Sequence, residues 1–156
     1  AMRESHWDEA TIAAMCYIHS PERMYMTDEE NWIEGSVGEF LESIGPFLEA
    51  RGVSALITEE QIGKGNGYSL KVNGELLVLY TEHELARTRG QETLARTSER
   101  INQLLLESGA PERTYCLYGW NELIVVFLTP EKFTELRAMP LVREHLNLYD
   151  PTLPVQ

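Results

Sequence analysis

The order of hydrophobic and polar positions along this chain predicts two β-hairpins. Tyr68–Val72 alternates strictly between apolar and polar side chains, as a half-buried strand does. Asn73-Gly74 follows it and is a strong hairpin signal, because both residues tolerate a positive φ. Glu75–Thr81 is the return strand, and its continuous apolar stretch predicts a central strand covered on both faces. Tyr115–Tyr118 and Leu123–Leu128 predict the second hairpin.

Helical spacing of apolar residues predicts two main helices. The first begins at a capping box, Ser36 to Glu39, and ends near Gly52. Pro46 lies inside it and predicts either a kink or a division into two helices. The second occupies most of residues 84–108. Its expected buried stripe consists of Leu94, Ile101, Leu104 and Leu105.

Shorter segments complete the predicted elements. Residues 8–19 are compatible with a helix capped by Asp8 or with a buried strand. Met24–Met26 and Val53–Ile62 are expected strands, and Asp28–Gly35 is an expected exposed acidic loop or turn. A last helix is expected to begin at Thr129–Glu131, with Thr129 as its cap and Pro130 at its first position.

These elements predict an α+β fold in a single domain of residues 2–156. We expect one antiparallel sheet of about five strands built from the two hairpins. Two main helices pack on this sheet, with short helices towards the ends of the chain. Proline residues break the tail, so an extended conformation is expected from about residue 140. Ala1 before Met2 is typical of an expression-tag remnant and is left out of the domain.

The charge of the chain, more than its overall composition, limits the kinds of partner that it can bind. The formal net charge is −12, and residues 22–60 contain ten acidic and two basic residues, a local net charge of −8. Such a domain repels nucleic acid and anionic membranes and attracts basic partners. No apolar run approaches the roughly 18 residues of a membrane span. We therefore expect a cytoplasmic protein that binds neither nucleic acid nor membrane.

The known motifs for metals, cofactors and nucleophiles do not fit. The loop Gly63–Gly67 precedes a strand, whereas a phosphate-binding loop precedes a helix. His83-Glu84 begins like a zinc-protease motif, but position 87 is Arg where the second His is required. Cys16 and Cys116 are expected to be buried thiols, although a disulfide between them stays open. We expect no metal, no cofactor and no catalytic residue.

The candidate contact residues are acids and two tryptophans. Trp32 lies in the middle of the acids, and an aromatic residue rimmed by charges is typical of a binding hot spot. A solvated acidic face and a buried structural role for Trp32 are the alternatives. Trp120 is expected at the tip of the second hairpin. The predicted partner-binding residues are Asp28, Glu29, Glu30, Trp32, Glu34, Glu39, Glu42, Glu59, Glu60, Trp120 and Glu122.

The size, charge and predicted α+β layout resemble those of small acidic immunity proteins of bacterial polymorphic toxin systems. The segments that suggest the resemblance are Thr27–Glu34 and Tyr118–Pro130. It implies a non-catalytic toxin inhibitor whose partner is a basic toxin domain, often a nuclease. By analogy with such inhibitors, the resemblance also implies that acidic side chains mimic nucleic-acid phosphates.

Two other classes of function stay open. One is an enzyme or small-ligand-binding protein with a dispersed pocket between sheet and helices. That pocket would be lined by Tyr80, Tyr115, Tyr118 and arginines of the 84–108 helix. The other is a scaffold subunit, which forms a homodimer through an exposed sheet edge.

Overall fold

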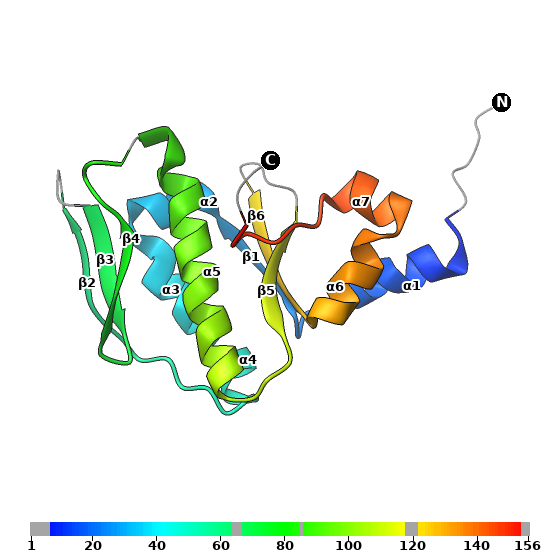
Figure 1. The fold of residues 1–156 in the computed structure, drawn as a ribbon, viewed down its shortest axis with the longest axis horizontal. Helices are drawn as coiled ribbons and strands as arrows, with labels where there is room; N and C mark the ends of the chain where they lie inside the picture. Colours follow the sequence, from blue (N-terminus) through cyan, green and yellow to red (C-terminus); the bar gives the residue numbers. More distant parts are fainter. Residues whose placement is uncertain (1–6, 64–66, 85, 118–121, 154–156) are drawn as a thin grey trace.

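The chain folds into layers of helices and two antiparallel sheets. The computed structural model describes residues 7–63, 67–84, 86–117 and 122–153, with the backbone alone for Glu122. Figure 1 shows one sheet on the left, a helical layer beside it, the second sheet, and a further helical layer on the right. The α+β class is therefore confirmed.

Each predicted hairpin belongs to its own sheet. Sheet A has the order β1-β6-β5, formed by Met24–Asp28, Glu122–Leu128 and Arg113–Leu117. Sheet B has the order β2-β3-β4, formed by Ile57–Gly63, Gly67–Val72 and Glu75–Tyr80. All their neighbouring strands are antiparallel.

The prediction of one sheet of about five strands was wrong. Each hairpin recruits a strand that precedes it in the chain: β1 pairs with β6, and β2 pairs with β3. The central helix α5 (Arg89–Glu107) packs against both β4 and β5, so it separates the two hairpins that we expected to join.

Two hydrophobic cores lie on opposite faces of sheet A. The first also includes sheet B, α5 and the short helices α3 (Val37–Ser43) and α4 (Gly45–Glu49). The second joins sheet A to α1, α6 and α7, which span Glu9–Ile18, Pro130–Arg137 and Pro140–Leu146. Sheet A is thus covered on both faces, whereas sheet B is covered on one.

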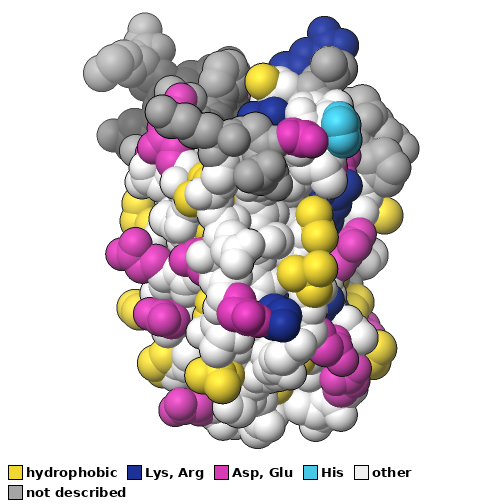
Figure 2. All heavy atoms as spheres, turned by 90° about the vertical axis from the view of Figure 1, so that its left-hand side faces the viewer, with side chains coloured by type: hydrophobic (Ala, Val, Ile, Leu, Met, Phe, Trp, Pro, Cys, Tyr) yellow, Lys and Arg dark blue, Asp and Glu magenta, His cyan; other side chains and the backbone are white. Residues whose placement is uncertain are grey.

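The prediction that the strand after Asn73-Gly74 is central and covered on both faces was also wrong. Strand β4 is an edge strand, and its outward-facing Leu76 and Val78 are 57% and 38% exposed. The run of apolar residues that suggested a central strand therefore includes two that face solvent. Figure 2 looks at this uncovered side, where apolar, acidic and basic side chains are interspersed with polar surface.

Several local predictions are confirmed. Asn73 and Gly74 both adopt positive φ, 53° and 81°, at the β3–β4 turn. Pro46 lies in the first turn of α4, where α3 has already ended. Asp8 caps α1 by accepting the Thr11 N–H at 2.7 Å, which settles residues 8–19 as a helix. Thr129 accepts the Lys132 N–H and caps α6.

Three segments differ from their predicted form. Residues 28–36 are largely helical: α2 covers Glu29–Asn31, and a π-type turn, η1, covers Trp32–Ser36. The predicted strand over 53–62 begins only at Ile57. The tail expected to be extended from about 140 contains α7, because Pro140 occupies the first turn, where its missing N–H is tolerated.

Candidate functional site

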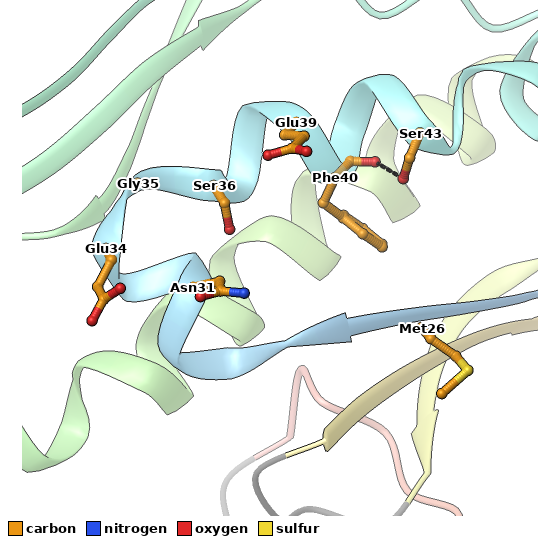
Figure 3. Close-up of a pocket in the computed structure, with 8 residues that line it drawn as sticks. All are labelled: Met26, Asn31, Glu34, Gly35, Ser36, Glu39, Phe40 and Ser43. Carbon is orange, nitrogen blue, oxygen red and sulfur yellow. Dashed lines mark hydrogen bonds between the residues drawn. The ribbon is translucent and has the colours of Figure 1, made fainter.

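An open groove lies between strand β1 and helix α3. Its volume is about 530 Å³. We call it the β1–α3 groove and define it by the residues that line it: Met26, Asn31, Glu34, Gly35, Ser36, Glu39, Phe40 and Ser43. In Figure 3 the Ser36 and Phe40 side chains project from the helix towards β1, whereas the Met26 thioether points away from the helix. The groove brings two of the predicted acids, Glu34 and Glu39, together with polar groups that the sequence had not indicated.

Gly35 kinks the chain within η1, just before α3 begins at Val37. Its φ is 117°, a region that other residues rarely adopt. The kink redirects the chain so that Glu34 precedes the bend and Glu39 follows it. Both carboxylates are exposed and line the same groove.

Trp32 supports the groove from inside and does not form its surface. The residue is 1% exposed, its ring lies 4.7 Å from that of Phe40, and its indole N–H donates to Thr27 Oγ1 at 2.7 Å. A surface hot-spot role for Trp32 is therefore wrong, and the buried alternative holds. The physical reason is that the expected acidic loop is helical and directs this side chain into the core.

The N-terminus of α3 is held by sheet B instead of by a local capping box. The Ser36 side chain, which the sequence predicted as the cap, makes no hydrogen bond to the start of the helix. The buried Val37 N–H donates to the Tyr68 hydroxyl at 2.9 Å, and the Gly38 N–H donates to Glu60 Oε2 at 2.9 Å. The Tyr68 hydroxyl in turn donates to Glu60 Oε2 at 2.6 Å. Burial, with the Glu60 carboxylate beside it, raises the pKa of Tyr68 well above its usual value.

Four of the predicted contact acids bond to or pack against other residues of this chain. Glu60 holds α3, as just described, and Glu59 pairs with Lys71 at 2.6 Å. Asp28 caps α2 by accepting the N–H groups of Glu30 and Asn31. Glu29 is partly buried beside Gly90 of α5. Burial is the larger cause that raises the pKa of its carboxyl, and the nearby negative charge of Asp28 is the smaller one.

The remaining predicted acids are exposed on the elements around the groove: Glu30, Glu34, Glu39 and Glu42. Within the described chain, none of these carboxylates forms a salt bridge. Other carboxylates are paired with cations, for example Glu112 with Arg51 and Glu84 with Arg96. The last two predicted residues, Trp120 and the side chain of Glu122, lie outside the described residues.

A second hollow of about 490 Å³ lies where η1 meets sheet B. Tyr80 and Arg89 line it, as does Glu34, which borders both hollows. Of the residues expected in a dispersed pocket, Tyr115 lies elsewhere, stacked on Phe133 at 4.0 Å in the second core. Tyr118 falls outside the described residues.

The histidine, cysteine and acidic side chains of the described residues are the ones that could hold a metal ion. Among the described residues, no three His, Cys, Asp or Glu side chains converge as a metal site would require. Both cysteines are free: Cys116 is buried and burial raises the pKa of its thiol, whereas Cys16 is exposed, contrary to the prediction. None of the helices in the described ranges combines the length and apolar character needed to cross a membrane.

Comparison with known proteins finds no matching family model, curated protein or solved structure for this chain.

Proposed function

We propose that this protein is a non-catalytic binding module that recognises a basic protein partner at the β1–α3 groove. The observation that carries the proposal is the set of exposed carboxylates on the groove and its bordering elements, which have no cation partner in the described chain. Glu34 and Glu39 line the groove, Glu42 lies on α3 with Glu39, and Glu30 lies on α2 next to the groove-lining Asn31. A partner that supplies lysine or arginine side chains would satisfy these charges.

Electrostatics favours this partner class over a neutral one. The net charge of −12 produces a long-range field that accelerates encounter with a basic protein. Salt screens exposed charges over about 10 Å at roughly 0.1 M ionic strength. Association should therefore slow markedly as salt is added.

The finer proposal is an immunity protein of a bacterial polymorphic toxin system, acting in the cytoplasm on a basic toxin domain. The acidic charge and the resemblance in size and layout support it. If the toxin is a nuclease, Glu34 and Glu39 would occupy positions that nucleic-acid phosphates otherwise take in its active site.

Co-expression with the reading frame immediately upstream of this gene tests the proposal. We expect that the neighbouring product arrests host growth when expressed alone, and that it is harmless and co-purifies when this chain is present. A neighbour that is harmless alone and does not co-purify would remove the immunity proposal.

A small-ligand-binding protein is the second candidate, and the hollow beside Tyr80 supports it. The Arg89 guanidinium lies 5.0 Å from the centre of the Tyr80 ring, so a cation and an aromatic face border one space. Binding of a neutral ligand there should hardly respond to salt, which distinguishes it from the acidic interface.

A further inference from the structure

At Met26, strand β1 presents an unpaired edge to the β1–α3 groove, whereas at the start of the strand the Met24 N–H donates to the Ser20 carbonyl at 3.0 Å. The Phe127 N–H donates to the Arg23 carbonyl at 2.9 Å, so Arg23 and Phe127 form a hydrogen-bonded pair. Along an antiparallel ladder bonded and non-bonded pairs alternate, so Tyr25 bonds to β6 and Met26 does not. The N–H and C=O of Met26 therefore point away from sheet A, and neither bonds to another described residue.

The other three outer edges of the two sheets are covered or interrupted. The C-terminal segment covers β5 through paired backbone bonds between Cys116 and Tyr149, both 2.9 Å. Arg96 and Arg100 donate to backbone carbonyls of β4. In β2, Glu59 has a φ of 49° where the register shifts, which breaks the regular edge. By contrast, Met26 is 66% exposed in the middle of β1.

The two sides of the β1 edge differ in chemistry. Met24 and Met26 share one face of β1, and Met24 packs on the second core. Tyr25 and Thr27 face the other way, towards the first core and α3. A strand added at this edge would have Glu39 and Ser36 above one of its faces and the Met26 thioether beside the other.

We infer that the partner contributes an extended segment that adds to β1 as an antiparallel strand, with basic and apolar side chains in alternation. The inference rests on the proposed function and specifies how the basic partner is recognised. Its basic side chains face Glu34 and Glu39, and its apolar side chains lie beside Met26. In an antiparallel ladder, directly paired residues have side chains on the same face. The backbone of an apolar residue of the segment therefore bonds to Met26.

A synthetic peptide of alternating lysine and valine tests this inference on the full chain. We expect it to bind, as measured by fluorescence anisotropy, and an alternating glutamate and valine peptide not to bind. Methylating the valine nitrogens should weaken binding at least about tenfold, because those N–H groups face β1. Methylating the lysine nitrogens should leave affinity within about twofold, because those N–H groups face solvent. Equal effects of the two methylated peptides, or the reverse order, overturn the inference.

Selective ¹⁵N-methionine labelling gives a direct readout on the protein side. The chain has five methionines, so an amide spectrum is simple to assign. Peptide binding should shift the Met26 amide signal and slow its hydrogen exchange, while Met15 on α1 stays unchanged. A peptide that binds without protecting the Met26 amide overturns strand addition.

Two substitutions at position 26 separate backbone from side chain. Both Met26→Ala and Met26→Pro remove the thioether, but only the proline variant removes the N–H at the open edge. We expect Met26→Pro to bind the peptide at least about tenfold more weakly than Met26→Ala, with both folded by circular dichroism. Equal affinities overturn the inference, and the methylated peptides decide it if the proline variant does not fold.

Failure of strand addition is distinguishable from failure of the proposed function. If the neighbouring gene product binds while the lysine–valine peptide does not, the acidic interface stands and strand addition falls. If neither binds, both fall.

Discussion

At the residue scale, the most consequential contact joins sheet B to the groove. Tyr68 accepts a hydrogen bond from the buried Val37 amide and donates one to Glu60. These bonds replace the Ser36 cap that the sequence suggested. They fix the start of α3, and with it the position of Glu39, against a strand that is distant in sequence.

Replacing Tyr68 with Phe tests this contact. The variant leaves the Val37 N–H buried without its acceptor, so we expect the free energy of unfolding to fall by about 1–3 kcal/mol. Glu59→Gln is the neighbouring control, because its exposed pair with Lys71 is worth less than about 1 kcal/mol. Urea denaturation measures both, and an equal loss in the two variants would contradict the role assigned to Tyr68.

A pH-dependent effect is expected at Glu29, whose pKa burial raises. Its folded-state pKa exceeds the unfolded value of about 4.3, so ionisation favours the unfolded chain. Below the unfolded pKa the cost is absent, and it grows as pH rises through the folded pKa. Glu29→Gln should therefore stabilise the protein at neutral pH, and this gain should disappear below about pH 4.

The control for this measurement is Glu30→Gln, because Glu30 is exposed on the same helix. Urea unfolding of both variants at the two pH values gives the comparison. A gain for Glu29→Gln that is the same at both pH values would show that packing, and not ionisation, is responsible.

At the element scale, some local signals were confirmed and others, such as the Ser36 capping box, were wrong, and pairing between distant strands was not predicted. The Asn73-Gly74 turn, the division at Pro46 and the Thr129 cap depend on a few adjacent residues, and each is confirmed. The split into two sheets depends on β1 reaching β6 across about a hundred residues, which periodicity does not encode.

The groove could be predicted only in part from the sequence, because one of its walls depends on pairing between distant strands. The density of acids indicated the region of Glu34 and Glu39. However, the sequence predicted Met26 only as part of a short strand. Its position on an open sheet edge follows from the pairing of β1 with the distant β6. Trp32 was misassigned because a tryptophan among acids looks the same in sequence whether it faces solvent or the core.

Strand β4 provides a test of the two-sheet arrangement. Leu77→Ala removes a side chain that is 7% exposed, so a loss of about 2–5 kcal/mol is expected. Leu76→Ala changes the adjacent, outward-facing leucine and should alter stability by no more than about 0.5 kcal/mol. Comparable losses in the two variants, measured by thermal or urea denaturation, would mean that β4 is covered on both faces.

At the scale of the whole molecule, charge and shape act together. The net charge of −12 disfavours contact with anionic surfaces, and within that field the β1–α3 groove carries exposed carboxylates that no described cation pairs with. A charge change at the groove should therefore matter more than the same change elsewhere. This distinction separates a specific interface from a uniformly acidic, solvated surface.

The most direct measurement is the affinity for the upstream gene product of two triple variants with the same net charge. One reverses Glu30, Glu34 and Glu39 to Lys at the groove, and the other reverses the exposed Glu99, Glu131 and Glu144 on α5, α6 and α7. We predict that the groove variant loses at least about 100-fold in affinity and the remote variant less than about tenfold, with unchanged melting temperatures. Equal losses in the two variants, or wild-type affinity in the groove variant, would contradict a binding site at the β1–α3 groove.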